Sequence, residues 1–125
     1  MPELLLKDEV YAVVGAAMDV YYTMGLGFLE PVYQEALRIE FGRREIPFAA
    51  QEPLSLHYKD TLLQKKYFAD FFCYSQIIVE IKVMERLSNR EMAQLINYMK
   101  ITRTRVGVLI NFGSRPTLEW KRCVV

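Results

Sequence analysis

The chain has 125 residues, of which 52% are hydrophobic and 25% charged, the balance of an ordinary globular protein. This composition excludes an intrinsically disordered chain, and the length fits one domain over residues 1–125 but not two. Sixteen basic and fifteen acidic residues give a net charge of +1. Overall charge is therefore no argument for a polyanionic partner, and any nucleic-acid surface must depend on local clusters.

The cysteines and the N-terminus bear on where the protein works. Cys73 and Cys123 lie far apart and have no C-x-x-C partner, which predicts free thiols in a reducing compartment rather than a disulfide framework or a zinc site. The first ten residues contain three consecutive leucines, too few for the apolar core of a signal peptide. No apolar run reaches transmembrane length. We expect a cytoplasmic protein with no membrane association.

The first half of the chain predicts two helices followed by strands. Apolar residues recur at helical spacing over residues 7–24, and Gly25 and Gly27 follow as stop signals. A second helix is expected from near Leu29 to Gly42, with a proline in its first turn. An alternating stretch then ends at Tyr58, a long strand is expected over residues 61–72, and an apolar strand over residues 77–83. The short connections favour antiparallel pairing of these strands.

The second half predicts one helix and two further strands. Ser88 and Glu91 form a capping-box pattern that opens a helix reaching Lys100. The continuous apolar run at residues 105–112 indicates a central strand, parallel to residues 77–83 because a helix separates the two. Residues 117–125 alternate as an edge strand would. The order α-α-β-β-β-α-β-β predicts an α/β sandwich around a mixed sheet.

Three charges interrupt the most apolar part of the chain. Asp70 lies inside an aromatic run, and Glu80 and Lys82 interrupt a run of Ile and Val. If the two strands pair antiparallel, Asp70 lies opposite or diagonal to Glu80. Strand alternation predicts one face of core residues and an opposite face that carries the charges. The expected core face is Ile77, Val79, Ile81 and Val83, and the opposite face is Ile78, Glu80 and Lys82.

These charges allow two interpretations. Carboxylates held close together take up a proton or need a cation between them, and Mg²⁺ prefers a few carboxylate oxygens and several waters. The alternative is a salt bridge from Lys82 to Asp70 or Glu80. The E-x-K pattern itself does not discriminate, because Glu119 and Lys121 repeat it on the expected edge strand.

The helix that follows bears on the same choice. Glu91, Gln94 and Tyr98 form one stripe on this helix. Gln94 is therefore either a solvent-facing amide or a polar group directed at the charged strands. The residue pattern alone leaves both interpretations of the charges open.

A family resemblance adds to this pattern. Asp70, Glu80-Ile81-Lys82 and a helix bearing Gln94 resemble the D…(E)xK…Q arrangement of the PD-(D/E)xK nuclease superfamily, which has the restriction-endonuclease-like fold. Gly27-x-x-Glu30-x-x-Tyr33 looks like the signature of the small bacterial GxxExxY proteins. The resemblance covers nearly the whole chain. One departure is that phenylalanine and alanine, not proline, precede Asp70.

The resemblance implies a role for each matching residue. Asp70, Glu80 and the Ile81 backbone carbonyl would hold Mg²⁺ or Mn²⁺, and Glu30 would hold the metal through water or bind a second ion. Lys82 would position or deprotonate the attacking water, or stabilise charge in the transition state. Gln94 would orient Lys82, the water or a phosphate. The expected activity is metal-dependent hydrolysis of phosphodiester bonds in DNA or RNA.

Several residues and partners have less specific expectations. Tyr33 and Tyr98 are either core tyrosines or supporting groups of the site, and Gly27 is a turn glycine before the second helix. Lys100, Arg103 and Arg105 form a basic cluster that is either a solvated face or a nucleic-acid contact. The alternative function is a non-catalytic module of the same fold that binds nucleic acid or a protein. The small size also favours a homodimer or a protein partner.

Overall fold

The structure, a computed structural model, describes residues 4–125. The domain expected over residues 1–125 therefore includes residues 1–3, which lie outside the described part. The elements are α1 (Lys7–Met24), α2 (Glu30–Arg43), β1 (Phe48–Leu54), β2 (His57–Tyr58), β3 (Thr61–Leu62), β4 (Tyr67–Cys73), β5 (Ile77–Lys82), α3 (Asn89–Thr102), β6 (Val106–Asn111) and β7 (Glu119–Val124).

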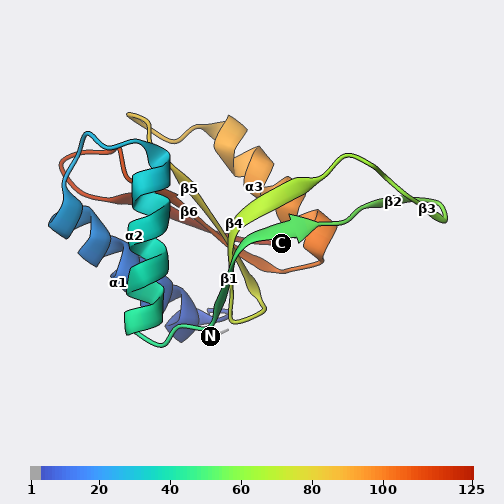
Figure 1. The fold of residues 1–125 in the computed structure, drawn as a ribbon, viewed down its shortest axis with the longest axis horizontal. Coiled ribbons are helices and arrows are strands. Elements are labelled where there is room, and N and C mark those ends of the chain that lie inside the picture. The colour runs from blue at the N-terminus through green and yellow to red at the C-terminus, as the bar shows by residue number, and fades with distance from the viewer. Residues whose placement is uncertain (1–3) are drawn as a thin grey trace.

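A five-stranded mixed sheet forms the centre of the molecule, in the order β1-β4-β5-β6-β7 (Figure 1). The β5 and β6 strands are parallel and are joined through α3, whereas the other neighbours are antiparallel. This is the expected α/β architecture and element order, with the small β2–β3 ribbon inserted between β1 and β4.

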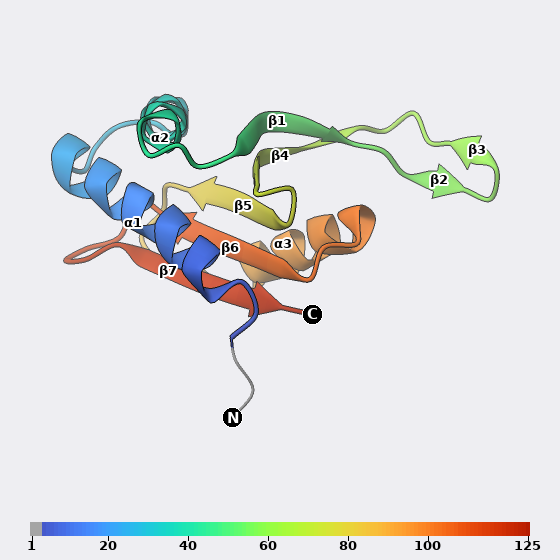
Figure 2. The same cartoon turned by 90° about the horizontal axis from the view of Figure 1, so that it is seen from below.

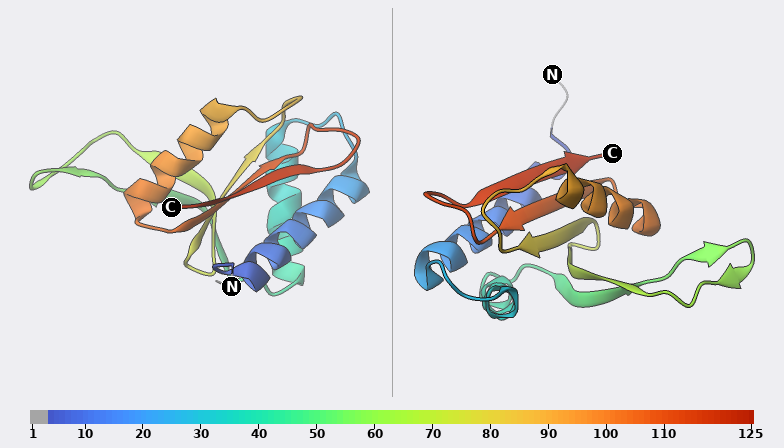
Figure 3. Two further views of the ribbon diagram at one scale, coloured as in Figure 1. Left: turned by 180° about the vertical axis from the view of Figure 1, so that it is seen from behind. Right: turned by 90° about the horizontal axis from the view of Figure 1, so that it is seen from above.

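The helices cover both faces of the sheet. Helices α1 and α2 pack on one face and α3 on the other, as the two side views make visible (Figures 2 and 3). Burying apolar side chains on both faces is what makes β5 and β6 nearly continuous hydrophobic runs. The sheet is thus the middle layer of three.

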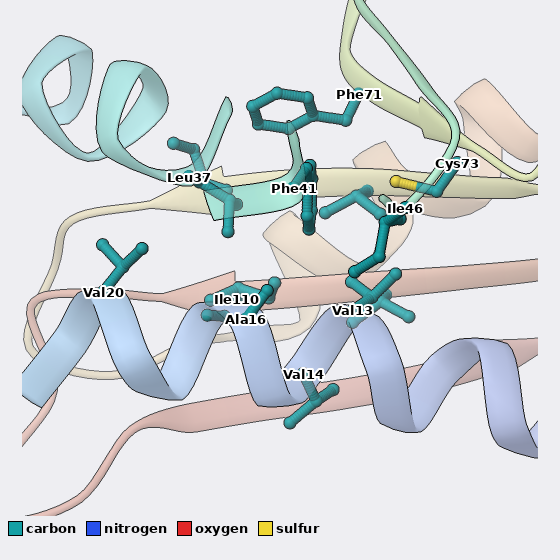
Figure 4. Packing of buried hydrophobic residues seen from close by; sticks show 14 of the residues in the cluster. Val13, Val14, Ala16, Val20, Leu37, Phe41, Ile46, Phe71, Cys73 and Ile110 are labelled. Atoms are coloured by element: carbon teal, nitrogen blue, oxygen red, sulfur yellow. The ribbon is translucent and has the colours of Figure 1, made fainter. Parts of the chain in front are cut away.

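The core on the α1 and α2 side is the larger of two clusters. Figure 4 shows Val13 and Val20 of α1, Leu37 and Phe41 of α2 and Ile110 of β6 around one another. Phe41 is fully buried and meets Phe71 edge-to-face at 5.0 Å between ring centroids. Tight aromatic contacts of this kind fix α2, and with it the helix start that faces the site, against β4.

The core on the α3 side confirms the alternation expected for β5 at Ile78, whereas the position expected for Val83 is wrong. Ile78 lies on the face opposite Ile77 and Val79, as expected, and this face is also covered, because Ile78 is fully buried in the α3-side cluster with Leu95 and Leu109. Val83, expected in the core, lies beyond the end of β5 and is 36% exposed. Alternation separates a buried face from a solvent face only where one side of a strand is uncovered.

The long strand expected over residues 61–72 is interrupted. The β3 strand ends at Leu62 and β4 begins at Tyr67, and no hydrophobic layer covers the residues between them. The first helix, in contrast, has the predicted bounds, and Ser88 and Glu91 make the predicted capping box. Within the described part of the chain, no helix is long and apolar enough to cross a membrane. Cys73 and Cys123 are both free.

Candidate active site

Asp70 lies where β4 and β5 separate. The β4–β5 ladder reaches Phe71 opposite Val79, and one residue further the Asp70 Oδ2 accepts a hydrogen bond of 2.8 Å from the Ile81 backbone N–H. The carboxylate therefore replaces the next backbone acceptor of the ladder and is held in one orientation. Since the N–H and C=O of a strand residue point to the same neighbour, the Ile81 carbonyl also faces the Asp70 side.

The backbone around Asp70 is distorted. Ala69 packs in the α3-side cluster, whereas Phe71, two residues on, packs with α1 and α2. On the neighbouring strand, Gln51 lies opposite Asp70 and has a φ of 53°, in the left-handed region that costs a non-glycine residue energy. The Gln34 side chain donates a 3.1 Å hydrogen bond to the Asp70 backbone carbonyl and supports this turn of the strand.

Glu80 is a buried carboxyl without a full set of partners. It is 4% exposed, and its Oε1 has no hydrogen-bond partner in the structure. Burial raises the pKa of Glu80 to about 10, and the hydrogen bond and negative charge of Asp70 act in the same direction, against the charge of Lys82. Two carboxyls share one small site here, which is the condition that a bound cation relieves.

Lys82 does not form the salt bridge that was the alternative interpretation. Its Nζ donates a 2.6 Å hydrogen bond to Oε1 of Gln94, on α3. In the described residues both ion pairs are made by Arg44, with Asp19 and Glu40. An amide leaves the ammonium charge of Lys82 uncompensated, so the charge remains available to an anion.

Glu30 lies in an open cleft beside Asp70. The cleft has a volume of about 360 Å³ and is lined by Glu30, Pro31, Gln34, Gln51 and Asp70. Partial desolvation raises the pKa of Glu30, the charge of Asp70 raises it further, and that of Lys82 lowers it. These couplings place Glu30 near the carboxyl pair, at the first turn of α2, where Pro31 follows it.

The turn before α2 is held by Tyr33. This residue is fully buried, donates a 2.6 Å hydrogen bond from its hydroxyl to the Gly25 carbonyl, and accepts one of 3.4 Å from the Phe28 N–H. Its ring stacks on Phe112 with centroids 4.8 Å apart. Gly27 has a φ of 104°, which glycine adopts without strain. Gly27 and Tyr33 thus shape the turn that sets the position of Glu30.

The remaining predicted residues divide into near and distant groups. Burial raises the pKa of Tyr98, and the charges of Glu80 and Asp70 raise it further, so its hydroxyl is within electrostatic range of the carboxyl pair. Lys100 lies in the last turn of α3, and Arg103 and Arg105 follow the C-terminal end of this helix. They precede Val106, which pairs with Ile77 at the start of β5, whereas the site is at the end of β5. The structure does not bring this cluster to the site.

The donor set fits a hard divalent cation. Among residues 4–125 no three Asp, Glu, His or Cys side chains gather as a ligand group, and Glu30 is expected to act through a water or at a second ion. Two carboxylates and one backbone carbonyl remain, and Mg²⁺ is commonly held by one or two carboxylates with waters filling its other positions. The unpartnered, buried Oε1 of Glu80 is the specific feature that a cation would satisfy.

Three polar residues near the site were missed from the sequence. Gln34 follows Glu30 by one helical turn, so the i, i+4 rule offered a signal. Gln51 had no such signal, because its place near the site depends on the pairing of β1 with β4, which sets it opposite Asp70. Asn111 is fully buried and accepts hydrogen bonds from the Met84 and Gly113 N–H groups at 3.0 Å each, which fixes the chain directly after Lys82. A buried asparagine in an apolar strand was the available signal for it.

This fold and site define a class of protein. The family model of the PD-(D/E)XK nuclease superfamily matches residues 7–123, so the chain belongs to that superfamily. One solved structure, described as the crystal structure of SSO0001, is similar with a TM-score of 0.60 and 14% sequence identity. The match covers 75% of this chain and 48% of that one, and at this identity it supports the fold alone. No curated protein sequence matches significantly.

Proposed function

We propose that this protein is a metal-dependent nuclease that hydrolyses phosphodiester bonds of DNA or RNA, with Mg²⁺ or Mn²⁺ as its cofactor. The observation that carries the proposal is Glu80: a buried carboxyl with an unpartnered oxygen, adjacent to Asp70 and to the charged Lys82. A decayed site has no reason to retain this costly arrangement, because an unpaired buried carboxyl destabilises the fold.

The residues have distinct proposed roles. Asp70, Glu80 and the Ile81 carbonyl hold the metal, while Glu30 acts through a water or at a second ion. When bound, a divalent cation activates water and neutralises phosphate charge. Lys82 orients the attacking water or stabilises the negative charge that develops on the phosphorus oxygens, and Gln94 fixes the direction of the Lys82 ammonium.

The Gly27, Glu30 and Tyr33 pattern supports a narrower assignment. We propose that the chain belongs with the small GxxExxY proteins and that in this chain Gly27 and Tyr33 of the signature place Glu30. The hydrogen bonds of Tyr33 to the Gly25 and Phe28 backbone are consistent with that role. A cytoplasmic location, and a homodimer or protein partner that enlarges the substrate surface, remain part of the proposal.

The test is a cleavage panel with single- and double-stranded DNA and RNA, with and without Mg²⁺ or Mn²⁺. Wild-type protein should cut at least one substrate only when metal is present, and Glu80→Ala and Lys82→Ala should abolish cutting. In parallel, Mg²⁺ should raise the melting temperature of wild type but not of Glu80→Ala, because binding to the folded state stabilises it. Metal binding without any cleavage would favour the non-catalytic module.

A further inference from the structure

The most extended part of the molecule is the arm, here defined as residues 55–66. It leaves the sheet between β1 and β4, and Figures 1 and 2 show it projecting away from the helices. Its strands pair only with each other, and the Leu63 N–H donates a 2.9 Å hydrogen bond to the Leu56 carbonyl at its base. Every residue of the arm is exposed. An isolated two-stranded ribbon is only marginally stable in water, so the arm is a feature that the core does not require.

The arm begins at the edge of the sheet that carries the candidate active site. Lys66 is followed directly by β4, whose pairing with β5 begins one residue after Asp70, with Phe71 opposite Val79. Asp70 follows Lys66, the end of the arm, by four residues, or about 13 Å of strand. A nucleic acid bound in the site can therefore also contact the arm.

The arm concentrates positive charge. It contains Lys59, Lys65 and Lys66 against one acid, Asp60, which gives a net charge of +2 where the whole chain has only +1. Lys59 lies 5.5 Å from the centroid of the Tyr58 ring. A basic ribbon on a protein of nearly neutral overall charge is typical of a surface that binds nucleic-acid phosphates.

The arm also exposes apolar groups that no part of residues 4–125 covers. Tyr58 is 65% exposed and Leu62 53% exposed, and they lie on opposite faces of the ribbon because Tyr58 pairs with Thr61 and Leu62 with His57. Apolar atoms on both faces suit a ribbon that is surrounded on both sides, as it is within a groove, and not one that rests flat on a surface.

We propose that the arm docks in the major groove of B-form DNA next to the cleavage position, with its lysines on the flanking phosphates. This inference rests on the proposed nuclease function and assigns that site a duplex DNA substrate. The major groove is about 12 Å wide and admits a two-stranded β-ribbon, whereas the major groove of A-form RNA is too narrow for side chains to read. From Ser55 to Asp60 the arm extends about 20 Å, which corresponds to roughly six base pairs of duplex.

The test is direct binding to labelled duplexes in EDTA, where no metal-dependent cleavage takes place. The probes are a DNA hairpin stem of about 8 base pairs, a DNA duplex of about 24 base pairs that spans both site and arm, and an RNA duplex of the same length. The variant is Lys59→Glu with Lys65→Glu and Lys66→Glu. The control carries the same charge reversal at Lys7, Arg43 and Lys121, which are exposed and lie outside the arm, on α1, α2 and β7.

Wild type should bind the long DNA at least about 10-fold more tightly than the short stem, and the arm variant should lose this preference while the control keeps it. The slope of log affinity against log salt should fall in magnitude by about 2.7, or 0.9 for each phosphate that the three lysines no longer neutralise. Unchanged binding by the arm variant overturns the proposal, as does an equal effect on RNA duplex, which would indicate phosphate binding without groove docking. A shift from dimer to monomer in the arm variant by sedimentation overturns it in favour of an interface between copies.

Binding and cleavage measured together distinguish a wrong docking arm from a wrong nuclease assignment. Arm-dependent binding to the long DNA, together with no cleavage of any substrate when metal is added, would support the docking arm and refute the enzyme. Conversely, metal-dependent cleavage that is equal in the arm variant and wild type on long DNA would support the enzyme and refute the arm. Far-ultraviolet circular dichroism of each variant checks that the exposed substitutions leave the fold intact.

Discussion

The ammonium of Lys82 is held by the amide of Gln94, at 2.6 Å, rather than by either carboxylate of the site. This hydrogen bond joins the end of β5 to one face of α3, and it leaves Lys82 with its full charge beside Asp70 and Glu80. A neutral acceptor restricts the direction of the lysine without neutralising it. The pair therefore behaves as one unit in the proposed chemistry, with Gln94 as the positioning residue.

Gln94→Ala should lower kcat by about 10- to 100-fold, the usual cost of removing a residue that orients a reactive group, with little change in stability. Gln94→Glu, which retains an acceptor oxygen, should recover part of the rate and change its pH dependence, because an ion pair replaces the amide hydrogen bond. Asn97→Ala, on an exposed position of the same helix, is the matched control and should leave the rate unchanged. Full activity in Gln94→Ala would contradict the positioning role.

Glu80→Gln should stabilise the metal-free protein at neutral and alkaline pH. The pKa of Glu80 is raised in the folded state to about 10, from an ordinary value near 4.5. Above pH 4.5 the unfolded state ionises and the folded state does not, so stability falls as the pH rises toward 10. The variant does not undergo this fall and should melt about 5 °C higher at pH 8.

The measurement is thermal unfolding in EDTA from pH 5 to pH 9 for wild type and Glu80→Gln. The two curves should nearly meet at pH 5 and separate steadily above it. Addition of Mg²⁺ at pH 8 should raise the melting temperature of wild type only, because the variant lacks the carboxylate ligand. If the melting temperatures of the two proteins instead change in parallel with pH, the pKa of Glu80 is the same in the folded and unfolded states and the prediction is wrong.

Local signals in the sequence predicted most of the fold. The capping box of Ser88 and Glu91 and the glycine after Met24 define helix ends through contacts within a few residues. The parallel pairing of β5 with β6 followed from the helix between them. Alternation placed Ile78 correctly opposite Ile77 and Val79, but the pattern contains no information that α3 buries this second face as well.

The candidate site was predictable only in part, for a related reason. Asp70, Glu80 and Lys82 stand out as charges in apolar strands, so each has a signal of its own. Gln51 owes its position to a distorted backbone opposite Asp70, and that distortion depends on contacts between strands far apart in sequence. The break in the strand expected over residues 61–72 likewise reflects missing tertiary cover, which no local propensity encodes.

Tyr33→Phe should weaken both stability and cleavage. The variant cannot form the hydrogen bonds to the Gly25 carbonyl and the Phe28 N–H, at a cost of about 1–2 kcal/mol in free energy of unfolding. Because this turn positions Glu30, kcat/KM should fall as well. Tyr21→Phe is the matched control, since Tyr21 is a buried tyrosine that donates a 2.6 Å hydrogen bond to a different carbonyl, that of Ser114.

Urea unfolding and cleavage rates of the two tyrosine variants separate the roles. Both should lose comparable stability, and only Tyr33→Phe should lose activity below the unfolding range. If Tyr21→Phe lowers activity equally, the loss of activity in Tyr33→Phe follows from reduced stability alone. The proposal that Tyr33 places Glu30 is then wrong.

Gly113→Ala should disturb the chain that follows Lys82. A Cβ at Gly113 would lie 2.6 Å from the Met84 backbone nitrogen and 2.7 Å from its carbonyl oxygen, and backbone atoms cannot move aside as a side chain can. We expect a decrease of about 1–3 kcal/mol in free energy of unfolding. We also expect a lower kcat, because the neighbouring Phe112 N–H donates a 2.8 Å hydrogen bond to the Lys82 carbonyl.

Gly42→Ala is the control for the glycine substitution. A Cβ there has no atom within 4 Å, and the residue is helical, so this change should stabilise the protein by up to about 1 kcal/mol and leave kcat unchanged. Urea unfolding gives both free energies, and single-turnover cleavage gives the rate of the chemical step. A Gly113→Ala protein with wild-type stability and rate would mean that the Met84 backbone shifts freely, and that the turn after β5 does not fix Lys82.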